Sequence, residues 1–154
     1  NLEYTDENGD LQRPVMIHRA ILGSFERFIM LLTEHFAGKF PIWLAPEQIR
    51  IITVNQEEMT TRAAAEIAAS AKKLGLRVYV DNDNESVGKK IRAAEVSKVP
   101  YSIVVGEREV SNGIVTPRVR KDISVIDTHP ELHFEQFVQT VYNEARSRVI
   151  KSSL

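Results

Sequence analysis

Residues 16–28, with the sequence MIHRAILGSFERF, place a histidine, two arginines and a glutamate inside an otherwise apolar run. A neutral imidazole is a common metal ligand, and a guanidinium can hold phosphate oxygens through two parallel hydrogen bonds. The pattern predicts a strand, a break at a glycine and the first turn of a helix. A packed core segment has no need of such charges. We therefore treat His18, Gly23 and Arg27 as candidate site residues.

Each of these residues also has an ordinary interpretation. A lone histidine in a strand is usually a packed or surface residue, and an arginine early in a helix usually faces solvent. The other histidines fit no ligand pattern and are expected on the surface; they are His35, His129 and His133.

A second group of polar residues lies in DNDNESVGKKIRAAE, residues 81–95, which runs from a predicted strand end into a helix beginning near Glu85. Open α/β sheets bind ligands at the carboxyl ends of their parallel strands. Lys89, Lys90 and Arg92 lie in the first turns of this helix, where the helix dipole disfavours cations. Their positions indicate an anionic partner such as a phosphate backbone.

A predicted hairpin further along the chain adds charge near the same edge, from Arg108, Glu109, Arg118, Arg120 and Lys121. The residues alone leave two interpretations open. The edge could bind an anionic partner, or it could be a solvated basic edge that keeps the sheet from pairing with another chain.

The composition narrows the classes of protein that could carry these residues. The chain has 154 residues, 43% of them apolar and 27% charged, as in an ordinary globular protein. A net charge of −1 argues against binding nucleic acid by a bulk positive field, so any such contact needs a local basic face. The sequence has no cysteine and no apolar run of membrane-spanning length. We expect a cytoplasmic protein without a membrane partner.

The elements that position these side chains fall into two parts. Residues 1–38 predict a hairpin turning at Asn8-Gly9, a returning strand in residues 13–22 and a helix from the N-cap Ser24 to Gly38. One hairpin and one helix are too small to bury their own apolar face. We interpret this part as the remnant of a larger domain, followed by a linker at residues 39–47.

Residues 48–154 show a regular alternation of strands and helices. The predicted strands are rich in β-branched residues and lie at 49–54, 76–80, 101–105 and 114–120. The predicted helices lie at 57–74, at 85–98 and from Phe134 to Ala145. This alternation predicts a three-layer α/β domain whose sheet is parallel first and antiparallel later.

VMIHRAILGSFERF (residues 15–28), followed by FAGKFPIWLAPEQ (residues 36–48), carries a family resemblance. The first stretch resembles the third conserved motif of class II aminoacyl-tRNA synthetases, and the two together resemble the threonyl-tRNA synthetases. The resemblance implies that residues 1–38 are the C-terminal remnant of an antiparallel α+β catalytic domain. It also implies that residues 48–154 form an anticodon-binding domain with a mixed, five-stranded-type sheet flanked by helices.

The resemblance implies roles for the three candidates in the first part. Arg27 corresponds to the motif arginine that binds ATP phosphates, and Gly23 lets backbone and nucleotide approach closely. His18 corresponds to one of three protein ligands of a zinc ion that holds threonine, and zinc favours nitrogen and sulfur ligands with one position open for substrate. The other two ligands and the first two class II motifs are expected upstream of residue 1. ATP and zinc are therefore expected in a longer protein, and neither on this chain alone.

The resemblance also favours RNA as the anionic partner. Asn84, Arg92, Glu109 and Arg118 fall at positions that contact anticodon bases in threonyl-tRNA synthetases. Ser86 departs from the lysine that similar proteins often have, which argues against a phosphate contact there.

Two hypotheses of different classes follow. In the first, the chain is the C-terminal part of a threonine–tRNA ligase, which joins threonine to its tRNA using ATP and works as a homodimer. The chain alone would then be catalytically inactive and could be monomeric, with threonine tRNA as its partner. In the second, it is a freestanding RNA-binding or subunit-interaction module that reuses the anticodon-binding fold. The motif arginine and histidine argue against the second hypothesis, because such a module needs neither.

Overall fold

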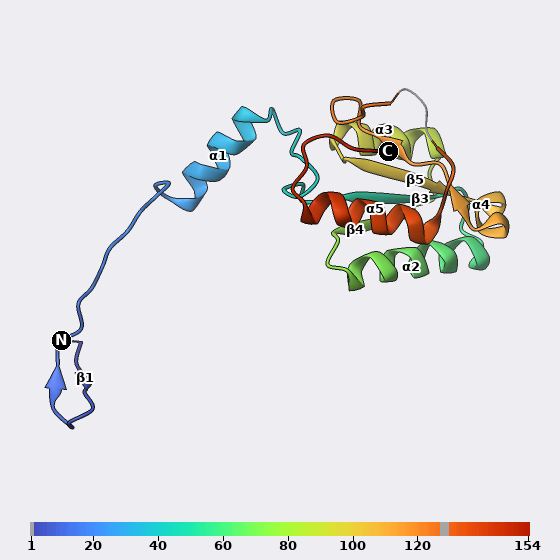
Figure 1. Ribbon diagram of the computed structural model, residues 1–154. Coiled ribbons are helices and arrows are strands. Elements are labelled where there is room, and N and C mark those ends of the chain that lie inside the picture. Colours follow the sequence, from blue (N-terminus) through green and yellow to red (C-terminus); the bar gives the residue numbers. More distant parts are fainter. Residues whose placement is uncertain (1, 127–129) are drawn as a thin grey trace.

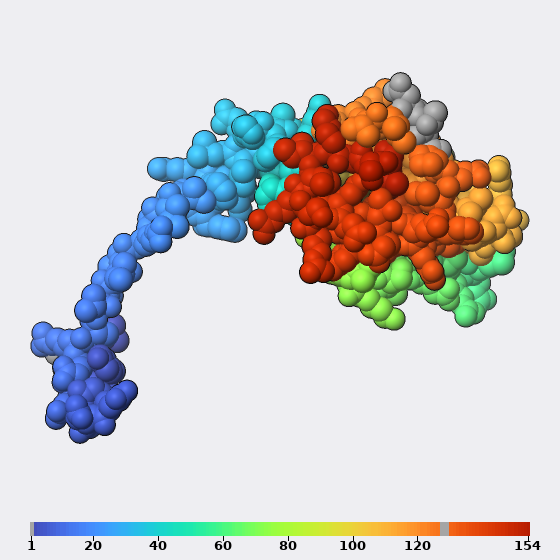
Figure 2. Space-filling model, in the orientation of Figure 1, coloured from blue at the N-terminus to red at the C-terminus, as the bar shows by residue number. Residues whose placement is uncertain are grey.

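The computed structural model describes residues 2–126 and 130–154. It contains a layered α/β domain and an N-terminal arm, residues 2–38, that extends away from the domain (Figure 1). In the view of Figure 2 the arm projects well beyond the domain surface. Among the described residues, no helix has both the length and the hydrophobicity that crossing a bilayer requires.

The arm begins with the predicted hairpin. Strands β1 (Tyr4–Thr5) and β2 (Leu11–Gln12) pair antiparallel. Asp6 Oδ1 accepts hydrogen bonds from the backbone N–H groups of Asn8 at 2.9 Å and Asp10 at 3.0 Å. Gly9 has a φ of +86°, which a side chain would disfavour. The predicted turn at Asn8-Gly9 is confirmed.

The returning strand predicted in residues 13–22 is wrong. The strand ends at Gln12, and residues 13–20 are exposed and have no regular structure. A strand needs a neighbour that satisfies its backbone groups, and β1 offers only two residues. His18 therefore lies on an extended, exposed segment.

Helix α1 (Phe25–His35) begins and ends close to the predicted residues. Ser24 Oγ accepts a hydrogen bond from the Arg27 N–H at 3.3 Å, which confirms Ser24 as the N-cap. Gly38, with a φ of +72°, closes the helix by donating its N–H to the Thr33 carbonyl at 2.9 Å. No residue of α1 is buried, and Phe25 is 74% exposed. The apolar face of the helix is thus uncovered, as expected for elements too small to bury it.

The domain is built on a mixed sheet of four strands. In sheet order these strands are β4 (Val78–Asp81), β3 (Ile49–Thr53), β5 (Tyr101–Val105) and β7 (Arg118–Val119). β3 pairs in parallel with β4 and β5, whereas β7 runs antiparallel to β5. The predicted change from parallel to antiparallel pairing is confirmed. The main sheet has four strands instead of five because β6 (Ile114–Val115) pairs with β8 (Leu132–His133) in a separate ladder.

Helices cover both faces of this sheet (Figure 1). The domain helices are α2 (Glu58–Lys73), α3 (Val87–Val96), α4 (Glu107–Asn112) and α5 (Phe134–Arg146). One core cluster joins the alternate residues of β3 and β5 to apolar residues of α2 and α5, including Ile51, Ile103, Ala64 and Phe137. α3 packs on the opposite face, where Ala94 is buried. The predicted three-layer α/β architecture is confirmed.

In the predicted hairpin, the antiparallel pairing of β5 with β7 is confirmed, but the connection is wrong because residues 107–112 form helix α4. Glu109 reaches back to accept a hydrogen bond from the Gly106 N–H at 3.0 Å, which stabilises the first turn. The strand predicted at residues 114–120 is divided into β6 and β7 by Thr116 and Pro117. Proline has no N–H to donate to a ladder, so the pairing partner changes at this point.

Lys90 does not face an anionic ligand, contrary to the prediction for the start of α3. Its side chain is buried, with 3% exposure, at the carboxyl ends of the parallel strands. The ammonium group donates to the carbonyls of Thr53 at 3.0 Å and Asp81 at 3.3 Å. The neighbouring Lys89 is exposed and pairs with Glu85. Lys90 thus satisfies the ends of β3 and β4 and joins them to α3.

We predict that Lys90→Met lowers the free energy of unfolding by about 2–3 kcal/mol. The substitution leaves two carbonyls without their donor, at a cost of about 1–3 kcal/mol for a buried unsatisfied group, partly offset because a charge is no longer buried. Lys89→Met is the matched control, with an expected loss below about 1 kcal/mol for an exposed ion pair. Urea denaturation of both variants measures the difference. Equal losses would contradict the assigned role of Lys90.

A buried polar cluster holds the C-terminus against the sheet. The Tyr101 hydroxyl donates to Glu144 Oε2, and the Tyr101 ring packs edge-to-face on Phe137 with centroids 6.1 Å apart. Glu144 Oε1 accepts hydrogen bonds from the Ser153 N–H at 2.7 Å and the Ser153 hydroxyl at 2.8 Å. Burial, followed by the hydrogen bond to Glu144, raises the pKa of Tyr101 well above its ordinary value of 10.0.

This raised pKa predicts a stability that falls at alkaline pH. In the unfolded chain Tyr101 loses its proton near pH 10, whereas in the folded chain the proton is retained. The stabilisation is therefore complete below about pH 10 and is lost as the pH rises toward the folded-state pKa, by about 1.4 kcal/mol per pH unit. We expect the stability difference between wild type and Tyr101→Phe to shrink by this amount in denaturant titrations from pH 8 to 11.

The exposed Tyr79→Phe serves as the control for loss of a tyrosine hydroxyl. A difference between wild type and Tyr101→Phe that stays constant across the pH range would show that the Tyr101 hydroxyl carries no pH-dependent stability.

Candidate nucleic-acid interface

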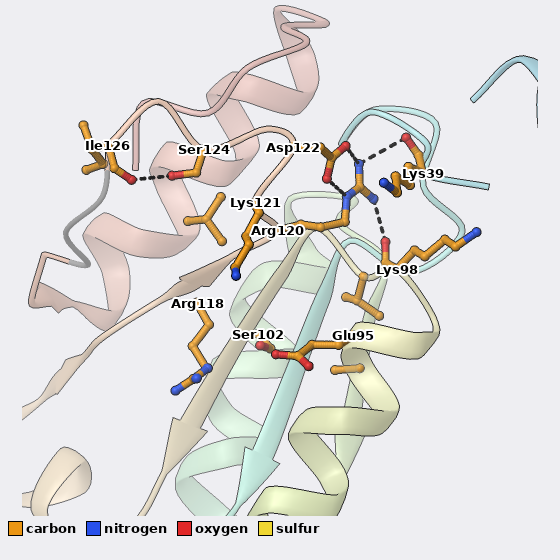
Figure 3. A pocket seen from close by; sticks show the side chains of 13 residues that line it. Lys39, Glu95, Lys98, Ser102, Arg118, Arg120, Lys121, Asp122, Ser124 and Ile126 are labelled. Carbon is orange, nitrogen blue, oxygen red and sulfur yellow. Dashed lines mark hydrogen bonds and ion pairs between the residues drawn. The ribbon is translucent and has the colours of Figure 1, made fainter. Parts of the chain in front are cut away.

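An open groove of about 900 Å³ lies between α3 and the segment that follows β6 (Figure 3). Its charged lining side chains are mostly cationic: Lys39, Lys98, Arg118, Arg120 and Lys121, against Glu95 and Asp122. The protein as a whole has a net charge of −1. The groove is therefore the kind of local basic face that an RNA contact requires in a chain of this charge.

Arg118 lies in the groove because of its register in the sheet. It is paired with Ser102 of β5, so both side chains point to the face of the sheet that carries α3. Figure 3 shows Arg118 near Ser102 and the α3 residue Glu95. Arg118 is exposed, and the described residues provide its guanidinium with neither a hydrogen bond nor an ion pair. Its five donors are available to a ligand.

The other cations of the groove differ in whether their side chains are hydrogen-bonded within the protein. Arg120 is bonded to Asp122 and to backbone carbonyls, and Lys98 donates to the Ala37 carbonyl. Within the described residues, Lys39 and Lys121 have no such side-chain contacts. The positive charge available to a ligand thus comes from Arg118, Lys39 and Lys121.

Glu109 stands at the carboxyl end of β5 on the first turn of α4. One carboxylate oxygen, Oε2, accepts the hydrogen bond from the Gly106 N–H. A Cβ at position 106 would lie 2.9 Å from Val54 Cγ2 and 3.2 Å from Glu109 Oε2, so this tight corner favours glycine. The cap fixes the Glu109 carboxylate at the edge of the sheet and leaves its second oxygen for another donor.

Asn84 lies at the same edge, in the loop that follows β4. It is exposed, and a hydrogen bond from Gln56 Nε2 to the Asn82 carbonyl at 3.0 Å joins this loop to the segment between β3 and α2. Ser86 is the N-cap of α3, with Oγ accepting from the Lys89 N–H at 3.4 Å. Its local role is to begin the helix.

Arg92 is exposed on α3, three residues before the groove residue Glu95. Residues three apart on a helix are neighbours on its surface, so Arg92 lies one turn from the groove. The four predicted RNA-contacting residues therefore occupy two positions on the domain, because Arg118 is opposite Ser102 near the amino end of β5, whereas Glu109 follows the carboxyl end of β5. Arg118 lines the groove, Arg92 flanks it, and Asn84 and Glu109 stand at the carboxyl ends of two strands.

The other predicted site residues lie elsewhere. His18 and Arg27 are exposed on the N-terminal arm, and Gly23 has a φ of +73° just before the N-cap of α1. The part of the chain that the structure describes holds no cluster of three side chains that could bind a metal ion. His35 and His133 are exposed, as predicted, whereas His129 lies outside the described residues.

Sequence reasoning missed several residues of the groove. Ser102 was assigned only to a strand, and Glu95 and Lys98 only to a helix, yet all three line the groove. A signal was present in the sequence, because Arg118 and Arg120 alternate along one strand and so share a face. What the spacing could not show is that α3 and the linker approach this face.

Comparison with known proteins identifies the family of the domain. Residues 48–144 match the family model described as the anticodon binding domain. The chain is 44% identical over 147 residues to the threonine–tRNA ligase of Geobacter sp. (strain M21), covering 96% of this chain and 22% of that protein.

Solved structures give the same relationship at the level of the fold. The RNA binding domain of threonyl-tRNA synthetase from Cryptosporidium parvum Iowa II matches with a TM-score of 0.70 and 31% identity, covering 99% of this chain and 36% of that one. Giardia lamblia prolyl-tRNA synthetase, in complex with prolyl-adenylate, matches with a TM-score of 0.59 and 25% identity over 71% of this chain and 25% of that one.

The chain spans about a fifth of the length of the curated relatives it resembles, with 22% of the Geobacter protein covered. The family model, by contrast, covers most of the chain, from residue 48 to residue 144, and coincides with the mixed sheet and its helices. This chain belongs to the anticodon-binding domain family of the aminoacyl-tRNA synthetases.

Proposed function

We propose that this chain recognises the anticodon of threonine tRNA as the C-terminal part of a threonine–tRNA ligase. The observation that carries the proposal is the exposed guanidinium of Arg118, which has no partner among the described residues and lies in a basic groove. The similarity to threonine–tRNA ligases over 96% of the chain supports the choice of tRNA. The longer protein would join threonine to tRNA using ATP, in the cytoplasm and as a homodimer.

Base recognition follows from the donors and acceptors at the groove. Threonine codons fix the last two anticodon bases as G and U. Unpaired bases expose their Watson–Crick and Hoogsteen edges to side chains. Arg118 can donate to guanine O6 and N7, a bidentate pairing that discriminates by about 1–3 kcal/mol.

The remaining three residues have complementary roles. Glu109 can accept from guanine N1–H or N2–H through Oε1, since Oε2 already accepts the Gly106 N–H. Asn84 has one donor and one acceptor and suits the mixed edge of uracil. Arg92 can stack on a base or neutralise a phosphate.

We predict that Arg118→Ala relaxes discrimination at the central anticodon base. Wild type should bind a threonine anticodon stem-loop about 5–150-fold more tightly than the same RNA with the central G replaced, because a bidentate contact is worth about 1–3 kcal/mol. Arg118→Ala should reduce this preference to about twofold or less. Fluorescence anisotropy with the two RNAs measures both ratios.

Arg108→Ala is the matched control, because Arg108 is also exposed and its guanidinium is 3.6 Å from Glu131, away from the groove. The control should keep the full preference. If Arg118→Ala weakens both RNAs equally and retains the preference, Arg118 is only a phosphate contact. If wild type binds neither RNA, the proposed function is wrong.

The residues assigned to zinc and ATP lie on the N-terminal arm. His18 is one exposed imidazole, and a catalytic zinc site has three protein ligands. Arg27 is exposed on the first turn of α1. We propose that His18 binds zinc and that Arg27 and Gly23 contact ATP in a longer protein.

We predict distinct defects for two variants of such a longer protein. His18→Ala should lose bound zinc, because two remaining protein ligands rarely hold a catalytic zinc. Arg27→Ala should keep zinc and lose threonine-dependent ATP–pyrophosphate exchange, because a guanidinium on phosphates acts through charge-assisted hydrogen bonds. Elemental analysis and the exchange assay distinguish the two, with the present chain as the negative control. Identical zinc content in both variants would refute the assigned roles.

A further inference from the structure

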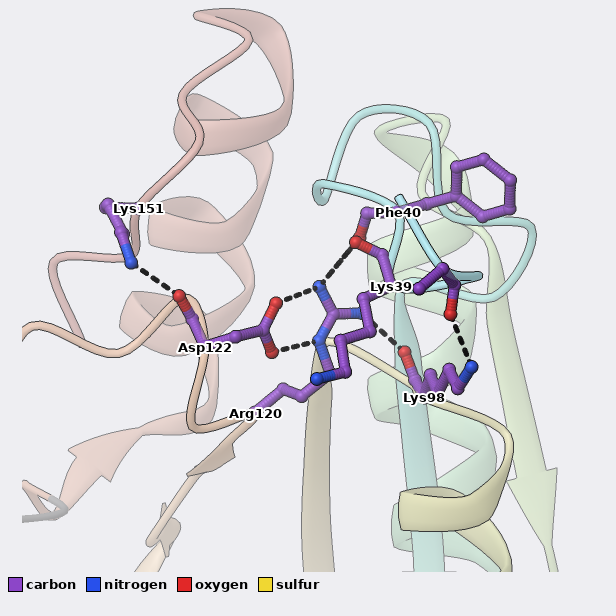
Figure 4. Close-up of polar contacts among 7 residues, drawn as sticks. Lys39, Phe40, Lys98, Arg120, Asp122 and Lys151 are labelled. Atoms are coloured by element: carbon purple, nitrogen blue, oxygen red, sulfur yellow. Dashed lines mark hydrogen bonds and ion pairs between the residues drawn. The ribbon is translucent and has the colours of Figure 1, made fainter. Parts of the chain in front are cut away.

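Arg120 ties the groove to the linker at residues 39–47. Its side chain is only 11% exposed and all of its nitrogens are used (Figure 4). Nη2 donates to the linker carbonyls of Phe40 at 2.9 Å and Lys39 at 3.1 Å, and Nη1 donates to the Lys98 carbonyl at 2.6 Å. Nε donates to Asp122 Oδ1 at 2.6 Å, which orients the guanidinium.

The same short segment carries Arg118. Both arginines line the groove, and the backbone N–H of Arg120 continues the sheet by donating to the Pro100 carbonyl at 2.9 Å. A displacement of β7 that moves Arg118 must therefore move the Arg120 backbone as well. Only Val119 lies between Arg118 and Arg120 in the chain, and the Arg120 side chain contacts the linker directly.

Two further cations hold this part of the chain. Lys98 Nζ donates to the Ala37 carbonyl, just before the linker. Arg77 donates to the linker carbonyls of Ala45 at 2.8 Å and Trp43 at 3.0 Å. Arg77 precedes β4 and does not line the groove. Arg120 and Arg77 thus bind different carbonyls of the linker. Of these two arginines, only Arg120 lies on the same segment as Arg118.

We propose that Arg120 is a positioning residue that couples RNA binding in the groove to the order of the linker and of helix α1 beyond it. The inference rests on the proposed function. Pro41, Ile42 and Ala45 of the linker are buried, whereas Lys39 is exposed and Phe40 is half-buried. Local opening is therefore expected at the start of the linker, where Arg120 holds the Lys39 and Phe40 carbonyls. An RNA that holds Arg118 restrains β7, keeps Arg120 on the linker carbonyls and so favours the closed linker. Helix α1 carries Arg27, so the RNA contact reaches the element expected to contact ATP.

Hydrogen–deuterium exchange on this chain tests the coupling. The probe is the threonine anticodon stem-loop at saturating concentration, and the readout is amide exchange in peptides covering residues 36–45. This stretch includes the Gly38 and Lys39 amides, which donate to the Thr33 and Phe36 carbonyls beside the part of the linker that Arg120 holds. In wild type the RNA should slow exchange there by about fivefold or more, the low end of coupling between linked sites.

Arg120→Met should still bind the RNA and show slower exchange at β7, with the RNA-dependent slowing in residues 36–45 reduced to about twofold or less. Arg77→Met is the matched control, since it also removes two bonds to linker carbonyls but lies outside the groove. It should raise exchange without RNA and keep the full RNA-dependent slowing. Arg120→Lys retains the charge and serves in place of Arg120→Met if that variant does not fold.

The outcomes separate the two proposals. If wild type binds the RNA and exchange slows at β7 but not in the linker, the coupling is refuted and anticodon recognition stands. If both Arg120 and Arg77 variants lose the slowing equally, Arg120 has only a structural role. If wild type does not bind the RNA, the proposed function fails and the coupling fails with it.

Discussion

The carboxyl ends of the parallel strands impose the constraint on which the domain depends. All five residues of β3 are buried between helical layers, and a buried carbonyl without a donor costs about 1–3 kcal/mol. Where the ladder of β3 and β4 ends, Lys90 supplies the missing donor from α3. One side chain therefore satisfies two strand ends and fixes the helix across them. The loop that carries Asn84 lies between these fixed points, so its position depends on this buried ammonium group.

The cations of this domain divide according to their partners. Lys90 and Arg120 are largely buried and satisfied by backbone carbonyls, whereas Arg118 is exposed in the groove. In a chain with a net charge of −1, affinity for RNA cannot rest on the overall field. Hydrogen-bond geometry at a few positions must supply specificity, and a guanidinium held at a fixed strand register is suited to it. The rigid interior of the domain thus presents a small number of available donors.

The N-terminal arm contrasts with the domain in how it is stabilised. Its hairpin and helix are held by local hydrogen bonds, such as those of Asp6 and Ser24, while its apolar side chains remain exposed. The linker is instead bonded to the domain through Arg120 and Arg77. The packed part of the structure therefore begins at the linker. The arm is joined to the domain through this linker, which the guanidinium groups of Arg120 and Arg77 hold.

Local sequence signals determined the features that depend on neighbours in the chain. The turn at Asn8-Gly9, the N-cap Ser24 and the alternation of buried strands with helices follow from glycine conformations, side-chain caps and hydrophobic periodicity, which need no tertiary partner. Tertiary structure decided what depends on distant groups. Residues 13–20 found no strand to pair with, residues 107–112 formed a helix where a hairpin was predicted, and Lys90 turned inward to strand ends 9 and 37 residues away in the chain. A lysine at a helix start has the same local pattern whether it meets solvent, phosphate or a buried carbonyl, because only the packing of other elements determines which of these surrounds it.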